Sequence, residues 1–184
     1  MATTYAALLR GINVSGHRKV PMAELRSVLE GLGHRNVRTY LQSGNAVFTT
    51  DRPATEDELN AELEDAIEAR FGFRVDCLVR DGDYLAAVAE ACPFPAAELE
   101  GKQLHAIYCS GPVEEERFAA IDRKAFLPEE FLLGDRVLYL YVPVGLGTSR
   151  LAAVVTRPSV VKGLVTTARN WNTVVKLVEM THED

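Results

Sequence analysis

The feature that most constrains the fold is a βαββα order of apolar segments that occurs twice along the chain. In its first occurrence, the apolar run over 3–9 predicts a buried strand, and apolar residues recur at helical spacing over 22–32. Two β-rich runs, 37–41 and 46–50, then flank a short polar turn at Ser43-Gly44. These segments predict a strand, a helix and a hairpin.

The first half continues with a second helix and a fourth strand. Thr55 and Glu58 have the spacing of a capping box, in which each side chain bonds the other residue's free backbone N–H. Alternating apolar residues over 73–79 predict the strand, and a short helix over 83–91 follows. A βαββαβ unit places two helices on one face of a four-stranded antiparallel sheet, which is the ferredoxin-like arrangement.

The second half repeats this order, with its end remodelled. A strand over 104–109, a helix opened by Gly111-Pro112 and a hairpin around Gly134-Asp135 correspond to the first steps. The remaining predictions are a helix from Thr148 to about Thr156, a short strand over 164–167 and a closing helix over 171–180. The expected fold class is therefore α+β, with two ferredoxin-like halves built on antiparallel sheets.

A proline-rich segment separates the two halves. Cys92-Pro93-Phe94-Pro95 holds two prolines and is followed by little apolar periodicity, which is typical of a linker. The sequence therefore predicts a first domain over 1–92, a linker over 93–101 and a second domain over 102–184.

Composition excludes several classes of protein. Hydrophobic residues make up 47% of the 184 residues, enough for a sizeable core. No apolar run reaches the roughly 18 residues that a membrane-spanning helix needs, and the start lacks the basic region of a secretory signal. The three cysteines include no C-x-x-C pair, so neither a disulfide framework nor a zinc site is indicated, and the cytoplasm is the expected compartment.

No set of catalytic or metal-binding residues is apparent. The four histidines lack metal-ligand spacing, and no serine or cysteine lies in a nucleophile elbow. We therefore predict no metal, no cofactor and no catalytic residues.

Charge is distributed unevenly along the chain. The net charge of −6 argues against a general nucleic-acid binder. Residues 1–50, however, hold six bases and two acids, and residues 150–184 hold five bases and three acids. The two ends of the chain are thus its basic parts.

Three polar segments stand out: Leu8 to Gly16, Arg38 to Asn45, and Thr167 to Thr173. In this order they resemble the DUF1697 family of bacterial proteins of unknown function, and the likeness covers nearly the whole chain. One departure is Ser15, where the family usually has glycine. The resemblance implies an α+β fold with ferredoxin-like halves, and it implies no established activity.

The first segment contains a Gly-x-x-x-x-Gly loop between a strand and a helix. A P-loop would require Lys and then Ser or Thr after Gly16, but His17 and Arg18 follow, and the sheet is antiparallel. What remains is an anion cradle formed by Arg10, Asn13 and backbone N–H groups. The simpler alternative is a βα connection in which Asn13 bonds its own backbone.

The second segment, which contains Gln42, Ser43 and Asn45, has two interpretations as well. It offers hydrogen-bonding side chains at the end of a sheet, beside the first loop. As a plain hairpin turn it needs only a glycine with positive φ and an asparagine that tolerates it.

The third segment precedes the closing helix. Asn170 is a good N-cap there. Arg169 lies beside a helix N-terminus and can clamp phosphate or carboxylate in bidentate fashion, or it forms a salt bridge to an acid of the middle segment.

Together the three segments bring Arg10, Arg38 and Arg169 but no acid. If they meet in the fold, three guanidinium groups repel one another unless an anion is present. The candidate ligand-binding residues are Arg10, Asn13, Arg38, Gln42, Ser43, Asn45, Arg169, Asn170 and Asn172.

The leading hypothesis is a non-catalytic module that binds a small anionic ligand, such as a nucleotide phosphate or the end of a nucleic-acid backbone, in an Arg/Asn-lined cleft. One alternative is an enzyme acting on a phosphorylated or carboxylated small molecule, which would need a general base. Another is a structural or interaction protein whose motifs only lock the two halves together. The sequence leaves the oligomeric state open, although exposed sheet edges permit dimerisation.

Overall fold

The computed structural model describes residues 2–183, which form two compact units. The first unit comprises the residues up to Leu85 together with those from Leu177 on, and the second comprises Ala86–Lys176. The extent of these units differs from the predicted domains 1–92 and 102–184, because the end of the last helix packs with the first sheet. The predicted linker over 93–101 belongs to the second unit in this division.

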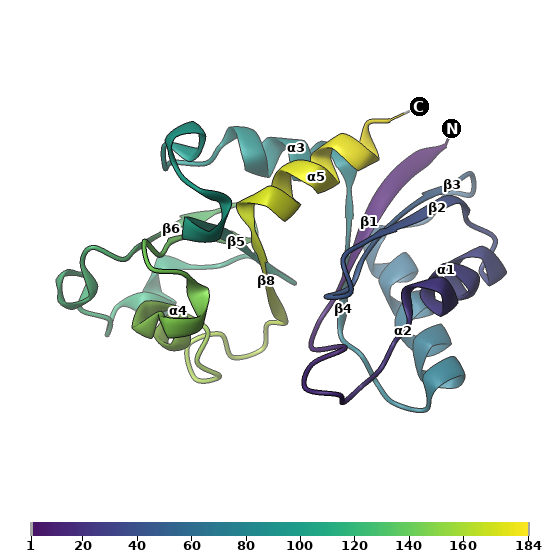
Figure 1. Cartoon of the computed structure of the whole chain (residues 1–184), viewed down its shortest axis with the longest axis horizontal. Coiled ribbons are helices and arrows are strands. Elements are labelled where there is room, and N and C mark those ends of the chain that lie inside the picture. The colour runs from purple at the N-terminus through teal and green to yellow at the C-terminus, as the bar shows by residue number, and fades with distance from the viewer. Residues whose placement is uncertain (1, 184) are drawn as a thin grey trace. The chain divides into compact units, whose positions relative to one another are not determined.

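The first unit is built on a four-stranded antiparallel sheet with strand order β2-β3-β1-β4. Two helices, α1 and α2, cover one of its faces (Figure 1). The bounds are β1 Thr3–Leu9, α1 Met22–Gly31, β2 Arg35–Tyr40, β3 Asn45–Thr50, α2 Glu56–Phe71 and β4 Cys77–Asp81.

The core of this unit follows from the alternation of side chains along the strands. Residues of β1, β3 and β4 that face the helices are buried against Leu25 and Leu29 of α1 and against the apolar face of α2. The capping box predicted at Thr55 and Glu58 is confirmed: each side chain accepts a hydrogen bond from the other residue's backbone N–H. The local sequence therefore determines where α2 begins.

The second unit repeats the topology of the first. Its four-stranded antiparallel sheet has the order β6-β7-β5-β8, in which each strand occupies the place of its counterpart in the first sheet. Its strands are β5 Leu104–Cys109, β6 Glu130–Gly134, β7 Val137–Tyr141 and β8 Thr166–Asn170. In each sheet the last strand runs directly into a helix: β4 into α3 (Gly82–Glu90) and β8 into α5 (Trp171–Thr181).

The connections of the second unit are short 3₁₀ turns and one short helix. The turns are Ala96–Glu98, Gly101–Gln103, Glu115–Phe118, Arg123–Phe126 and Leu146–Thr148, and the helix is α4, Arg150–Val155.

Three predictions in this unit need correction. The helix expected after Gly111-Pro112 is replaced by two 3₁₀ turns, and Phe118, Ile121 and Phe126 of this stretch pack into the core of the unit from these turns. The next helix is capped by the side chain of Ser149, so it begins two residues after Thr148. The last strand is displaced from 164–167 to Thr166–Asn170, where it pairs with β5.

The predicted fold class is confirmed: two four-stranded antiparallel sheets are combined with helices in an α+β architecture. Among residues 2–183, no helix has the length and apolar character needed to cross a bilayer.

Candidate functional site

The first two sequence segments meet at one end of the first sheet. The backbone N–H of Leu9 donates to the carbonyl of Gly44 (2.9 Å), and the side-chain amide of Asn13 donates to the carbonyl of Gln42 (2.7 Å). Gly44 has a φ of +102°, and a Cβ there would lie 2.8 Å from Cβ of Leu9. Only glycine permits this close approach of the β2–β3 turn to the β1–α1 loop.

Asn13 holds the β1–α1 loop together. Its amide nitrogen donates to the carbonyl of Val20 (3.0 Å) as well as to Gln42, and its Oδ1 accepts from the Val20 N–H (2.8 Å). The backbone of Asn13 is left-handed, with φ of 55°, a conformation that asparagine tolerates better than most residues. Asn13 therefore acts as a clasp between the loop, the start of α1 and the neighbouring turn.

The backbone of the same loop is unusual. Five of its residues have positive φ: Gly11, Asn13, Ser15, Gly16 and Arg18. Three of these are not glycine, and residues held in this region cost free energy that the surrounding contacts must offset. Alternating left- and right-handed residues turn successive backbone N–H groups inward and form concavities that favour anions.

A cavity of about 390 Å³ lies between this loop and the beginning of α1. It contains one cation, Lys19, whose side chain is exposed and forms no ion pair or hydrogen bond with any residue in 2–183. The cavity is lined by Asn13, Gly16, Lys19, Val20, Pro21, Met22 and Gln42. No aspartate or glutamate belongs to this lining.

The start of α1 adds backbone donors to the cavity wall. Pro21 precedes the helix and provides no side-chain cap, and the first bonds of the helix run from Glu24 and Leu25 to the Pro21 carbonyl. The N–H groups of Met22 and Ala23 consequently have no acceptor within the helix. The nearest acid of the helix, Glu24, is paired with Arg70.

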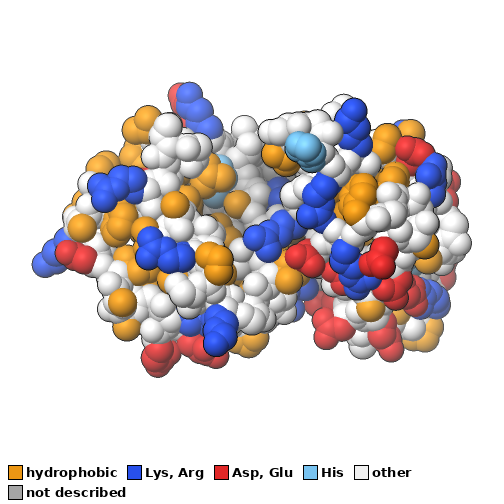
Figure 2. All heavy atoms as spheres, turned by 90° about the horizontal axis from the view of Figure 1, so that it is seen from below, with side chains coloured by type: hydrophobic (Ala, Val, Ile, Leu, Met, Phe, Trp, Pro, Cys, Tyr) orange, Lys and Arg blue, Asp and Glu red, His pale blue; other side chains and the backbone are white. Residues whose placement is uncertain are grey.

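The second helix of the first unit, α2, is rich in acids. Figure 2 shows acidic side chains gathered with basic ones on one face of this unit. Several acids of α2 are paired with arginines, as Glu62 is with Arg52 and Asp65 with Arg74. These exposed pairs make α2 a charged face in contact with solvent.

Arg10 and Arg38 have acidic partners, so the expectation that these arginines lack them is wrong. Arg10 lies 4.0 Å from Asp76, and both side chains are about half exposed, so the pair is weak. Arg38 forms an ion pair with Glu183 and donates to the carbonyl of Met180 (2.7 Å). Because carbonyl groups at a helix C-terminus attract cations, Arg38 fixes the end of α5 to β2.

Ser43 and Asn45 serve the hairpin turn. Asn45 is fully buried, and its side-chain amide donates to the carbonyl of Tyr40 (2.7 Å) and to Oγ of Ser43 (3.4 Å). The turn interpretation accounts for these contacts.

Arg169 and its neighbours belong to the second unit. Arg169 is buried, and its Nη1 donates to Oγ1 of Thr167 (2.7 Å) and to the carbonyl of Ala168 (2.9 Å). Burial lowers the pKa of Arg169 to about 10, against a smaller opposing effect of Tyr108.

The other two residues of this segment have local contacts. Asn170 accepts a hydrogen bond from the Thr173 N–H (3.0 Å), which confirms it as the cap of α5. The side chain of Asn172 is exposed and lies against Gly101. The joining of this segment with the other two into one site stays a prediction.

Sequence reasoning missed two residues. Lys19 was passed over because a Walker motif requires its lysine immediately after the second glycine, whereas this one stands three residues later. Arg80 occupies in β4 the place that Arg169 occupies in β8: each lies opposite an alanine of the central strand, Ala6 or Ala106. Each also donates from Nη1 to the preceding carbonyl. Aligning the two halves residue by residue would have revealed this pair.

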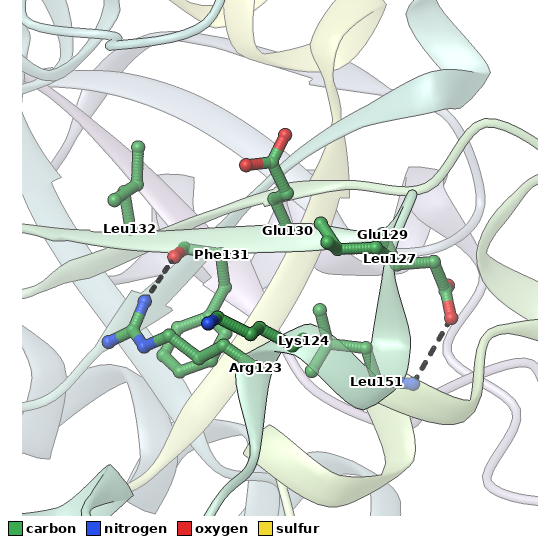
Figure 3. A pocket seen from close by; sticks show the side chains of 8 residues that line it. All are labelled: Arg123, Lys124, Leu127, Glu129, Glu130, Phe131, Leu132 and Leu151. Atoms are coloured by element: carbon green, nitrogen blue, oxygen red, sulfur yellow. Dashed lines mark hydrogen bonds between the residues drawn. The ribbon is translucent and has the colours of Figure 1, made fainter.

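A smaller cavity, of about 210 Å³, lies in the second unit beside β6 (Figure 3). Its lining includes two acids, Glu129 and Glu130, and two cations, Arg123 and Lys124, of which Arg123 is paired with Glu115. An anion is therefore less favoured there than in the cavity beside Lys19. Within residues 2–183 no three His, Cys, Asp or Glu side chains cluster as metal ligands do, and the three cysteines are free thiols.

The two sheets and their helices define an α+β protein with two ferredoxin-like halves. The family model of DUF1697, a protein of unknown function, matches residues 2–139, and the chain belongs to this family. The resemblance noted in the sequence is thereby confirmed.

The solved structures include a protein of the same fold. The conserved bacterial protein SP0830 from Streptococcus pneumoniae is 24% identical to this chain and matches it with a TM-score of 0.78, over 100% of both chains. At this identity the likeness shows the fold alone. No curated protein matches the chain.

Proposed function

We propose that the protein is a non-catalytic binding module that holds the phosphate or carboxylate group of a small molecule in the cavity beside Lys19. The observation that carries this function is the combination of an exposed ammonium group, which has no partner among residues 2–183, with a cavity that no acid lines. A cation in such surroundings attracts an anion without first having to release a carboxylate.

The cavity has the size and donors that such a ligand needs. Its volume of about 390 Å³ falls within the usual range for small-molecule sites. Beside Lys19, Pro21 and Met22 bring the start of α1 to the cavity, and a helix N-terminus favours negative charge. The left-handed residues of the β1–α1 loop give its backbone the kind of conformation in which successive N–H groups favour an anion.

Binding is favoured over catalysis by the chemistry of the lining. None of the lining residues carries a carboxylate, an imidazole or a thiol, and the one amine among them, Lys19, is the group that would hold the anion. The side-chain amide of Asn13 is already hydrogen-bonded to Val20 and Gln42. The cavity is thus equipped to hold an anion and lacks a group that would transform it.

The test is thermal unfolding in the presence of inorganic phosphate, nucleoside monophosphates and small carboxylates. A ligand that binds only the folded state raises the melting temperature with increasing concentration. We expect this rise in wild type and in Lys162→Gln, a control that removes an exposed lysine of the second unit, and its loss in Lys19→Gln. Equal shifts in both variants, or no shift in wild type, would contradict the function.

A further variant tests the wider site that the sequence predicts. If Arg169→Ala leaves the ligand-induced rise unchanged, the site is confined to the first unit. If Arg169→Ala abolishes the rise while the variant remains folded, the third segment belongs to the site.

A further inference from the structure

The two sheets differ in their equivalent edge strands, β2 and β6. In the first sheet β2 is irregular: its register shifts between Arg35 and Arg38, and Asn36 has a φ of 53°. Bulges and charged residues of this kind prevent an edge strand from pairing with another chain. In the second sheet β6 pairs with β7 in a continuous register and contains the apolar run Phe131 to Leu133.

The register fixes which backbone groups of β6 face the open edge. Gly134 pairs with Val137 across a two-residue turn, and residues of an antiparallel pair alternate between bonding inward and facing outward. The N–H and C=O groups of Phe131 and Leu133 therefore face away from β7. The contact of Arg123 agrees with this, because its Nη1 donates to the Phe131 carbonyl (2.7 Å) from outside the sheet (Figure 3).

Two leucines beside this edge are exposed. Leu132 is 40% exposed and Leu127 is 58% exposed, and both line the cavity beside β6. An edge strand that is regular, apolar and accessible is a template for strand pairing.

We propose that β6 pairs with β6 of a second copy of this chain, antiparallel about a two-fold axis at Leu132. In this register Phe131 of each copy lies opposite Leu133 of its partner. The backbone N–H and C=O groups of these residues then face each other across the contact and can form hydrogen bonds. Leu132 then lies opposite Leu132, where a non-hydrogen-bonded pair brings side chains closest together.

The charges of the surface favour a second copy over a foreign chain. The patch beside the edge carries charges of both signs, the bases Arg123 and Lys124 and the acids Glu129 and Glu130. A two-fold contact apposes the same patch on both subunits and can match each sign with its opposite. A partner segment of one sign would meet both attraction and repulsion.

Arg123 opposes this association in the isolated chain. Its guanidinium donates a hydrogen bond to the Phe131 carbonyl and lies 3.9 Å from the centroid of the Phe131 ring. It is also paired with Glu115. When β6 pairs with β6 of the second copy, the Phe131 carbonyl must lose its hydrogen bond from Arg123 and accept one from a backbone N–H of the second copy. The dimer is therefore expected to be weak and dependent on concentration.

Sedimentation velocity of the full chain, from micromolar to millimolar concentration, tests the proposal. Wild type should pass from monomer to dimer, and Arg123→Ala should do so at lower concentration because the Phe131 carbonyl is released. Leu132→Lys should weaken the dimer by about tenfold or more, since like charges would lie directly opposite each other. Val175→Lys, which changes a residue of similar exposure on α5, should leave it unchanged.

Two results would overturn the proposal. One is a wild-type chain that stays monomeric over the whole concentration range. The other is a dimer that Leu132→Lys leaves intact, or that Val175→Lys weakens equally, with folding of both variants verified by circular dichroism. The ligand experiments with Lys19→Gln are independent of this outcome.

Discussion

The two halves of the molecule share a sheet and differ in what connects its strands. Both sheets have the same strand order, and both place a buried arginine, Arg80 or Arg169, opposite an alanine of the central strand. In the first half the connections are α1 and α2, of 10 and 16 residues, whereas the second half has 3₁₀ turns and the six-residue α4. The sheets thus maintain the architecture, and the connections supply what is individual to each half.

Each half has one feature that the other half lacks. The β1–α1 loop, with its left-handed residues and Lys19, has no counterpart of the same kind in the second half. The second half instead has a regular and exposed edge strand, β6. We therefore expect ligand binding to depend on the first half and self-association on the second.

The largest expected effect compares the glycines of the two hairpins. Gly44→Ala should cost about 3–4 kcal/mol, because it forces an L-residue into positive φ and drives Cβ against Cβ of Leu9, which cannot rotate away. Gly134→Ala meets the ring of Tyr139 and a methyl group of Val137 at ordinary φ and should cost about 2 kcal/mol. Urea denaturation followed by circular dichroism measures both. Equal costs would show that the β2–β3 turn is no tighter than its counterpart.

The second comparison concerns pH. Burial lowers the pKa of His105 to about 4, while the equivalent position of the first sheet holds Tyr5, whose pKa burial raises. The unfolded chain then binds a proton at His105 between pH 6.5 and 4 that the folded chain does not. Stability should fall by about 3 kcal/mol as pH drops through this window.

The variant His105→Phe should remove most of this loss. Trp171 is the one tryptophan of the chain and lies in the second unit, so its fluorescence during urea denaturation at several pH values reports the effect. His34 of the first unit, whose pKa burial also lowers, should preserve a smaller pH dependence. An unchanged slope in His105→Phe would contradict the assignment.

The patterns with local causes were predictable from the sequence. The capping box at Thr55, the N-cap at Asn170 and most of the order of strands and helices along the chain follow from nearest-neighbour chemistry and apolar periodicity. The partner of Arg38 was not predictable, because Glu183 is 145 residues away and is brought close only by tertiary folding. The loss of the helix after Pro112 depends likewise on how Phe118 and Phe126 pack, which periodicity alone does not determine.

The candidate site, too, was only partly predictable from the sequence. Asn13 and Gln42 were expected to lie together, and a hydrogen bond joins them. Both residues line the cavity. Its cation, Lys19, belongs to none of the conspicuous motifs. The motifs therefore predicted the contact between the loop and the turn, but not the position of Lys19 beside them.

A third comparison concerns the side chains that tie loops together. Asn13→Ala removes three hydrogen bonds from the β1–α1 loop and should cost about 2 kcal/mol. Ser110 accepts one bond, from the Val165 N–H (2.9 Å), in the loop after β5, and Ser110→Ala should cost about 1 kcal/mol. Asn13→Gly keeps the left-handed backbone accessible and separates the loss of the bonds from backbone strain. Thermal unfolding of the three variants makes the comparison.

The smallest effects are expected at the helix caps. Thr55→Ala removes the cap of α2, and Ser149→Ala removes the cap of α4; each should cost about 1 kcal/mol. Because α4 has only six residues, Ser149→Ala should also increase amide hydrogen exchange along the whole helix, whereas Thr55→Ala should affect only the first turn of α2. Hydrogen-exchange mass spectrometry distinguishes these patterns.

The central claim, that the β1–α1 cavity binds an anion, is tested most directly by titrating the ¹⁵N-labelled chain with inorganic phosphate and following its amide resonances. We predict saturable shifts that are largest at Gly16, Lys19, Met22 and Ala23 and that disappear in Lys19→Gln. Shifts that do not saturate, or that centre on residues away from this loop, would contradict it.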